Sequence, residues 1–163
     1  MLVLAWSGLG KGAAIGRLVE QLGCAQRVVW LGRTGLTLLL AALDVLALPY
    51  RFPIGQNAFP NVLLEAHGIG VPLVTTRIPV VDEGCVDTET ALLVRRDEPE
   101  TLAGAVEQLL ADESMRNHMV SCQQRRYADQ FSANVLARRY EDLYSEVLAE
   151  RTPVAQRCGL SLA

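Results

Sequence analysis

The chain has 163 residues, of which half are hydrophobic and 20% are charged, and its formal net charge is −3. This length is enough for one hydrophobic core of ordinary size, so we expect one domain. The sequence has no dense block of Lys and Arg. Nucleic-acid binders neutralise several phosphates with clustered cations, and the composition therefore argues against nucleic acid as a partner.

The cysteines and the apolar runs exclude two further classes of protein. The four cysteines lie far apart and form no C-x-x-C pair, so we expect reduced thiols in a cytoplasmic protein rather than a zinc site or a disulfide framework. The most apolar run, 36–48, is interrupted by Asp44. It is also shorter than the roughly 18–20 residues of a membrane span, so we expect neither a membrane helix nor a secretory signal.

The chain begins with a strand, a helix and a second strand. LVLAW at 2–6 is an apolar run of strand length, and apolar residues then recur at helical spacing until Gly23 ends the helix. RVVWLG at 27–32 is the second strand. The alternation continues with a short helix at 35–43, a strand at 44–49, a helix from Pro60 to about Ile69 and a strand at 71–76.

Continuous apolar strands that alternate with helices are typical of a parallel sheet covered on both faces. The sequence therefore predicts an α/β fold, a Rossmann-like parallel sheet with helices on both faces. After a last short strand at 90–96 the chain becomes helical, with helices at 97–112 and at about 113–129. We expect the domain to occupy residues 1–150 and the remainder, 151–163, to be a loose tail.

The final helix is predicted to begin after Ser132, which is expected to cap it. Its apolar residues recur at helical spacing and predict a buried stripe. The residues of this stripe are Val135, Leu136, Tyr140, Leu143 and Val147.

Near the amino end, GLGKGA at 8–13 matches the dinucleotide-binding pattern, follows a strand and opens a helix. The acidic residue that holds the ribose in such sites is missing, because the second strand ends in Gly32 and Arg33. An arginine there can accept a 2′-phosphate, so an NADP-binding module that uses Gly8, Gly10 and Arg33 stays an alternative. A phosphate-binding P-loop is excluded, because Gly12 stands where Ser or Thr would bind magnesium.

A second candidate site lies in GQNAFPNVLLEAHGIGVPLV at 55–74. Its loop leaves the strand 44–49 at the carboxyl edge of the predicted sheet, which is where open α/β sheets bind ligands. It then enters a helix at Pro60, and the start of a helix offers free N–H groups and a partial positive charge. This position suits an anionic ligand, and we predict a phosphate.

Seven segments, taken together and in this order, resemble the carboxyl-terminal, donor-binding domain of family 4 (group 1) glycosyltransferases with the GT-B architecture. They cover about residues 2–149. The segments are LVLAWSGLGKG, LGCAQRVVWLGR, LLAALDVLALPYR, AFPNVLLEAHGIGVPLVTT, TETALLV, DEPETLAGAVEQLLAD and FSANVLARRYEDLYSEVL. The resemblance implies a retaining transfer from a UDP- or GDP-sugar to a glycan or glycolipid, with no metal and no further cofactor.

The resemblance also implies which residues bind the donor. The family has two glutamates separated by seven residues; the second, which accepts hydrogen bonds from the ribose hydroxyls, matches Glu65. The first falls on Asn57, where an amide lacks the charge of a carboxylate. Residues between the two lend N–H groups to the diphosphate and the sugar, although Pro60 has none to give. The donor-binding residues implied are Gln56, Asn57, Ala58, Phe59, Pro60, Asn61, Val62 and Glu65, with Arg33 beside the base and Arg51 facing either a phosphate or solvent.

Three further features depart from the family. Thr88 and Ala91 stand where relatives place glycine at a turn, and side chains resist positive φ. His67 stands where relatives often have an apolar residue, so we expect a packed or partly exposed imidazole rather than a catalytic one. The family's acceptor-binding domain, and a first strand-helix unit that supplies an arginine and a lysine to the diphosphate, are expected before Met1 but are missing.

We therefore expect the chain by itself to bind a nucleotide weakly and to turn over nothing detectable. Its expected partner is a separate acceptor-binding domain or subunit. The alternatives are a non-catalytic remnant or a partner subunit of a glycosyltransferase. Family members mostly build bacterial polysaccharides and glycolipids, which implies a place in the cytoplasm or at the inner face of the cell membrane, with peripheral membrane association of the whole enzyme.

Overall fold

The computed structural model describes residues 1–5, 12–32, 34–51 and 60–150. The chain forms two compact units, the first up to Ala42 and the second from Leu43 onward. The expected extent of a single domain at 1–150 stays a prediction. None of the helices in the described ranges is both long enough and apolar enough to cross a membrane.

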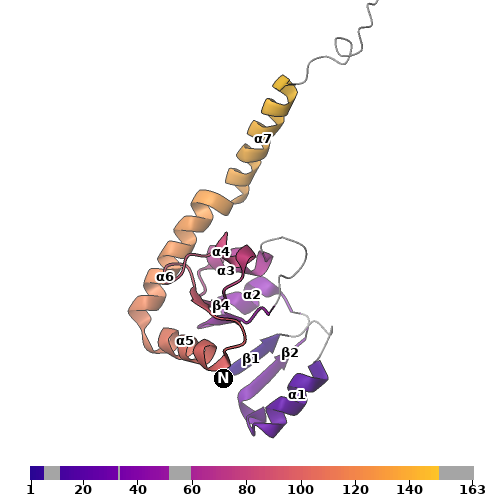
Figure 1. Cartoon of the computed structure of the whole chain (residues 1–163), viewed down its shortest axis with the longest axis vertical. Helices are drawn as coiled ribbons and strands as arrows, with labels where there is room; N and C mark the ends of the chain where they lie inside the picture. The colour runs from indigo at the N-terminus through magenta and orange to yellow at the C-terminus, as the bar shows by residue number, and fades with distance from the viewer. Residues whose placement is uncertain (6–11, 33, 52–59, 151–163) are drawn as a thin grey trace, which may run out of the picture. The chain divides into compact units, whose positions relative to one another are not determined.

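The first unit contains a parallel strand pair joined through a helix (Figure 1). β1 (Leu2–Ala5) pairs in parallel with β2 (Val28–Leu31). Between them lie α1 (Gly12–Gln21) and a 3₁₀ turn (Ala25–Arg27), and α2 (Leu36–Ala41) follows β2. These elements confirm the predicted strand-helix-strand order.

The second unit contains a three-stranded parallel sheet in the order β3-β4-β5. β3 (Leu46–Leu48), β4 (Leu73–Thr76) and β5 (Leu92–Val94) are the middles of the three predicted strands. Leu46 lies opposite Leu73, and Val74 lies opposite Leu92. All three carboxyl ends therefore lie at one edge of the sheet.

The described part of this unit also has six helical segments. They are α3 (Asn61–Ile69), α4 (Pro79–Asp82), α5 (Pro99–Ala111), α6 (Glu113–Arg126), a π-helical turn (Tyr127–Phe131) and α7 (Ala133–Glu150). α3 ends at Gly70, whose φ of +85° favours glycine, and a Cβ at that position would lie 2.8 Å from a methyl carbon of Val120 on α6. α6 begins at Asp112, whose carboxylate accepts the N–H of Met115 at 2.8 Å.

The core of the second unit lies on both faces of the sheet, because successive residues of β4 point to opposite sides. Leu73 packs in one cluster with Leu63 of α3 and Val81 of α4. Val74 packs in the other cluster with Leu109 of α5 and Met119 of α6. The predicted fold class, parallel strands with helices on both faces, is confirmed.

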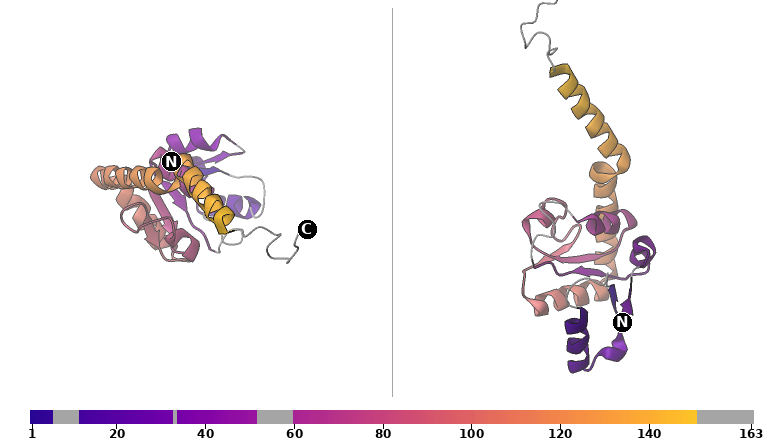
Figure 2. Two further views of the ribbon diagram at one scale, coloured as in Figure 1. Left: turned by 90° about the horizontal axis from the view of Figure 1, so that it is seen from above. Right: turned by 90° about the vertical axis from the view of Figure 1, so that its right-hand side faces the viewer.

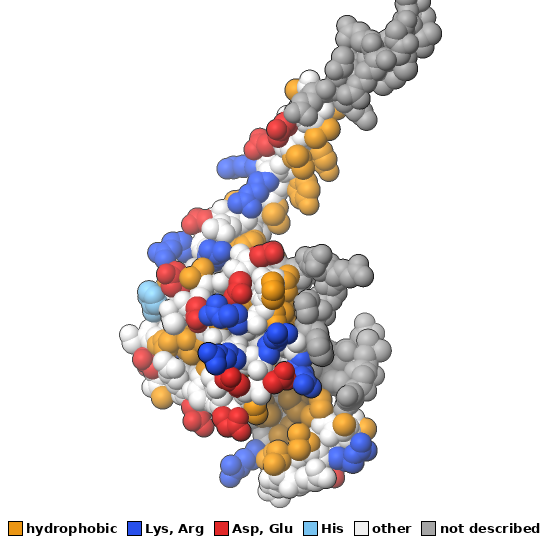
Figure 3. All heavy atoms as spheres, in the orientation of Figure 1, with side chains coloured by type: hydrophobic (Ala, Val, Ile, Leu, Met, Phe, Trp, Pro, Cys, Tyr) orange, Lys and Arg blue, Asp and Glu red, His pale blue; other side chains and the backbone are white. Residues whose placement is uncertain are grey.

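The predicted buried stripe on the last helix is wrong. α7 projects away from the rest of the unit (Figures 1 and 2), and its apolar side chains line one side of it (Figure 3). Leu136, Tyr140, Leu143 and Val147 are exposed, and Val135 is half-buried. Helical spacing of apolar residues indicates a face that favours burial, but it does not supply the surface that buries it.

Ser132 has the predicted position but a different hydrogen bond. Its carbonyl accepts the N–H of Leu136 at 3.0 Å, as the residue before a helix does. Its hydroxyl donates to the carbonyl of Ala128 at 3.0 Å, on the preceding turn. The side chain therefore ties α7 to the π-helical turn.

Candidate functional site

The carboxyl edge of the three-stranded sheet carries an arginine soon after each strand. Arg51 follows β3, Arg77 follows β4 directly, and Arg95 and Arg96 follow β5. Two threonine hydroxyls tie the ends of β3 and β4 together: Thr75 donates to the carbonyl of Leu48 at 2.9 Å and Thr76 to that of Tyr50 at 2.6 Å. The arginines therefore start from adjacent, fixed backbone positions.

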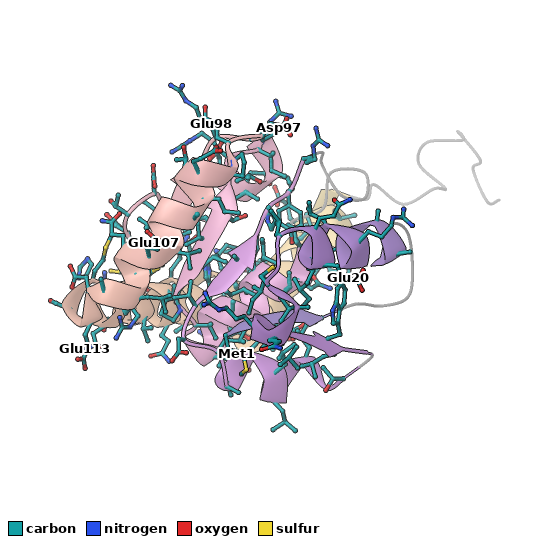
Figure 4. All side chains as sticks on the ribbon, turned by 90° about the horizontal axis from the view of Figure 1, so that it is seen from below. Met1, Glu20, Asp97, Glu98, Glu107 and Glu113 are labelled. Atoms are coloured by element: carbon teal, nitrogen blue, oxygen red, sulfur yellow. The ribbon has the colours of Figure 1, made fainter. Side chains whose placement is uncertain are left out.

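The same four arginines line an open depression of about 450 Å³ together with Asp97 and Glu98. Both acidic residues lie at the amino-terminal end of α5 (Figure 4). Sequence reasoning selected Arg51 alone and missed the other three arginines. The signal was present, since an arginine follows each of three neighbouring parallel strands, and the carboxyl ends of such strands meet at one edge.

The start of α3 is the second component of the site. Pro60 precedes the helix with φ −64° and ψ 124°, and its carbonyl accepts the N–H of Leu63 at 2.9 Å. The N–H groups of Asn61 and Val62 are in the first turn, so no carbonyl within the helix can accept them. Asn61 is exposed and Val62 is half-buried. This helix start can donate to an anionic group.

Glu65 lies on α3 opposite the buried face of the helix. It is about 200° around the helix axis from the fully buried Leu63. Its side chain is half-buried and forms no hydrogen bond or ion pair with another residue in the described ranges. As far as the described residues go, both carboxylate oxygens can accept protons from a ligand.

Several predicted site residues lie outside the described residues, and their roles stay predictions. They are Arg33, Gln56, Asn57, Ala58 and Phe59, together with Gly8 and Gly10 of the alternative dinucleotide site. The geometry of the site therefore rests on Arg51, on Pro60 to Val62 and on Glu65.

His67 is fully buried between α3 and the segment around Cys85. Its Nε2 lies 3.8 Å from the Cys85 sulfur. Burial, together with the nearby charge of Arg126, lowers the pKa of His67 to about 4. Burial likewise raises the pKa of the Cys85 thiol to about 12. Both groups are thus neutral near pH 7, and the prediction of a packed imidazole is confirmed.

The turn between α4 and β5 keeps the backbone conformation that glycine would favour. Thr88 has φ +64°, and its N–H donates to the carbonyl of Ala91 at 2.8 Å. Ala91 is fully buried and is not among the residues with positive φ. The expected conflict between side chain and turn therefore exists at Thr88 but not at Ala91.

Comparison with known proteins identifies the family. The model for "Glycosyl transferases group 1" matches residues 3–112. A D-inositol 3-phosphate glycosyltransferase from Corynebacterium urealyticum is 32% identical over 130 residues, which are 78% of this chain and 28% of that protein. N-acetyl-alpha-D-glucosaminyl L-malate synthase from Bacillus anthracis is 30% identical over 135 residues, 82% of this chain and 34% of that protein. The chain thus spans about a third of the length of these curated relatives.

Solved structures share the fold. HepE from Anabaena, crystallised with UDP, matches with a TM-score of 0.74 and 24% identity over 82% of this chain and 36% of that one. A glycosyltransferase from Rickettsia africae matches with a TM-score of 0.80 and 16% identity over 91% of this chain and 40% of that one. The chain belongs to the group 1 glycosyltransferase family and corresponds to its carboxyl-terminal half.

Proposed function

We propose that this chain binds the donor, a UDP- or GDP-sugar, for retaining glycosyl transfer to a glycan or glycolipid. The observation that carries the proposal is the carboxyl edge of the second sheet, where the start of α3 and the carboxylate of Glu65, which has no partner among the described residues, follow β3. Family membership supports it, as do the crystal structures of HepE, a protein of similar fold, with UDP and with UDP-glucose.

In this proposal Glu65 holds the ribose. A carboxylate has two acceptor oxygens, so it can take the protons of both hydroxyls of a cis-diol. The N–H groups of Asn61 and Val62 face the diphosphate, with the positive end of the α3 dipole behind them. Pro60 contributes the turn into the helix but no hydrogen bond.

The proposed chemistry needs more than this chain. When the sugar leaves the donor, negative charge grows on the diphosphate, and cationic side chains and a helix start stabilise it. We propose that this occurs without a metal ion, and that the acceptor is bound by a separate domain or subunit. The described residues hold no group of three or more His, Cys, Asp or Glu side chains placed to bind a metal ion. By itself the chain should bind a nucleotide and turn over nothing.

A non-catalytic partner subunit or remnant is the second candidate. Thr88 favours it, because a β-branched residue at φ +64° carries strain that a glycine would remove. Measuring glycosyl transfer after mixing the chain with an acceptor-binding half of the family would separate the two candidates. Transfer would support the donor-binding half of an enzyme, and nucleotide binding without any transfer would support the non-catalytic role. For either candidate we propose a place in the cytoplasm or at the inner face of the membrane.

Ligand-induced thermal shifts test the proposed binding. A ligand at 100 times its dissociation constant stabilises the folded state by about 2.7 kcal/mol, so UDP or GDP should raise the melting temperature measurably. Glu65→Ala should remove that shift, and Glu65→Gln, which keeps the size but loses the charge, should reduce it. A shift with NADPH alone, or a UDP shift that survives Glu65→Ala, would contradict the proposed site.

A further inference from the structure

The four arginines Arg51, Arg77, Arg95 and Arg96, named here the arginine edge, line one open depression at the carboxyl edge of the sheet. We infer that the arginine edge is a binding site for a phosphate group. Arginine suits this role because its planar guanidinium can donate two parallel hydrogen bonds to phosphate oxygens. The chain has 15 cationic residues, and Lys11 is its single lysine, so arginine supplies nearly all of its positive charge.

Arg77 is held in place before any ligand arrives. Its backbone N–H donates to the carbonyl of Val94 at 2.8 Å, which joins it to the end of β5. Its guanidinium donates to Asp82 at 3.3 Å and to Asp87 at 2.5 Å. Because a guanidinium has five N–H donors, these two contacts leave donors for a ligand.

Arg96 is the least neutralised member of the arginine edge. Its guanidinium donates to the backbone carbonyl of Arg51 at 3.3 Å, and it has no carboxylate partner among the described residues. Arg51 pairs with Asp97 at 2.7 Å, while Arg95 lies 3.9 Å from Glu98. These pairs leave Arg96 with an uncompensated positive charge beside the depression.

Arg96 supplies the positive charge that a phosphate would meet at the depression. Asp97 and Glu98 line the depression and pair with Arg51 and Arg95, while Asp82 and Asp87 pair with Arg77 from outside the lining. The paired guanidinium groups still have N–H donors for phosphate oxygens. α5 begins directly after Glu98, so its dipole adds positive potential at the same place.

Surface stabilisation explains the arginine edge less well. The side chains in the ion pairs of the arginine edge are open to solvent, with exposures of 41–86%. Pairs of this kind contribute little to stability, because water screens them. Placing four arginines around one depression therefore has a small folding benefit, while it supplies many N–H donors for an anion.

This inference rests in part on the proposed function, because the phosphates of the donor are one source of the group that the arginine edge would bind. The headgroup of an anionic lipid is the other. Experiments can distinguish these two sources of phosphate. Uridine lacks phosphate, pyrophosphate lacks the nucleoside, and a lipid vesicle presents phosphate only at its surface.

Titration calorimetry with pyrophosphate tests the site on the whole chain. The double substitution Arg95→Gln/Arg96→Gln should weaken pyrophosphate binding about tenfold or more, because charge-assisted hydrogen bonds are lost. The matched control is Arg138→Gln/Arg139→Gln, which removes an adjacent pair of exposed arginines from α7. Equal losses in both doubles, or no binding of pyrophosphate by the unaltered chain at low salt, would overturn the inference.

The remaining arms identify the source of the phosphate. If the donor supplies it, the Arg95/Arg96 double should weaken UDP about tenfold and leave uridine unchanged, whereas Glu65→Ala should weaken both. If a lipid supplies it, vesicles containing phosphatidylglycerol should bind through the same two arginines. The affinity for UDP should then be the same in the unaltered chain and in the Arg95/Arg96 double variant. Pyrophosphate binding that depends on Arg95 and Arg96, combined with an unchanged UDP affinity in Glu65→Ala, would support the phosphate site. The same result would contradict the proposed nucleoside site.

Discussion

The second unit has two polar regions of opposite character. At the contact between α3 and α6, polar side chains are fully buried: Gln123 donates to the carbonyls of Val71 and Thr90 at 3.0 and 2.8 Å, and His67 is enclosed beside Cys85. At the arginine edge, charged side chains converge on an open depression and are largely exposed. Buried polar groups with backbone partners stabilise a fold, whereas exposed guanidinium groups that keep free N–H donors around one depression favour an anionic ligand.

The largest effect on stability is expected at Gln123. Gln123→Met keeps much of the volume but removes both donated hydrogen bonds, which leaves the buried carbonyls of Val71 and Thr90 without this donor. We expect the free energy of unfolding in urea to fall by about 3 kcal/mol or more, because buried polar groups left without partners cost about 1–3 kcal/mol each. The exposed neighbour Gln124, which donates to the carbonyl of Ile69 at 3.2 Å, provides the control. Gln124→Met should cost well under half as much, and equal losses would contradict the role given to burial.

His67 should make stability depend on pH between about 4 and 6.5. Its folded-state pKa of about 4 is below the ordinary 6.5, so in this range the unfolded chain binds a proton that the folded chain does not. Stability due to the neutral imidazole is therefore complete above pH 6.5 and is lost as the pH falls toward 4, by about 3 kcal/mol. Urea unfolding across this range checks the slope.

The control for the pH dependence is the second histidine. His67→Leu should flatten the slope between pH 4 and 6.5, even if it also changes the stability at pH 7. His118 is exposed on α6, so His118→Gln should leave the slope as it is. A slope that persists in His67→Leu would mean that carboxylates, and not the buried imidazole, set the pH dependence.

A smaller effect, in the stabilising direction, is expected at the turn before β5. Thr88 is exposed and has φ +64°, a conformation that costs residues with a side chain roughly 1–2 kcal/mol. Thr88→Gly removes that cost but adds freedom to the unfolded chain, so we expect a net gain of about 0.5–1 kcal/mol in urea unfolding. Thr88→Asn, which tolerates this conformation better than threonine, should fall between the two. A loss of stability with glycine would show that the threonine side chain has a role of its own.

The sequence predicted the periodic features of the molecule well. The apolar runs at 44–49, 71–76 and 90–96 each contain an observed strand, and the helix after Pro60 begins at Asn61, because local pattern and packing agree there. Prediction from the sequence failed where the burial of a residue depends on which other surface packs against it. The stripe at Leu136, Tyr140 and Leu143 has helical spacing, but these side chains are exposed. The spacing of apolar residues does not reveal which surface, if any, packs against them.

The candidate site divides in the same way. Glu65 and the helix start were predicted through a family resemblance, which carries information about ligands that the residues alone lack. The arginine edge was missed, since Arg51, Arg77 and Arg96 are separated by up to 45 residues and only the parallel register brings them to one edge. Arginines at the end of, or just after, each of these three predicted strands would have indicated it.

The smallest effect on stability is expected from the arginine edge, and it separates the two polar regions most sharply. Arg95→Gln/Arg96→Gln should change the free energy of unfolding by less than about 0.5 kcal/mol without ligand, because the ion pair lost, Arg95 to Glu98 at 3.9 Å, is exposed to water. With saturating pyrophosphate the double variant should be markedly less stable than the unaltered chain, because the variant no longer gains the free energy of binding. A loss comparable to that of Gln123→Met without any ligand would assign the arginines to the fold, because a site kept for a ligand should cost little when it is removed in the ligand's absence.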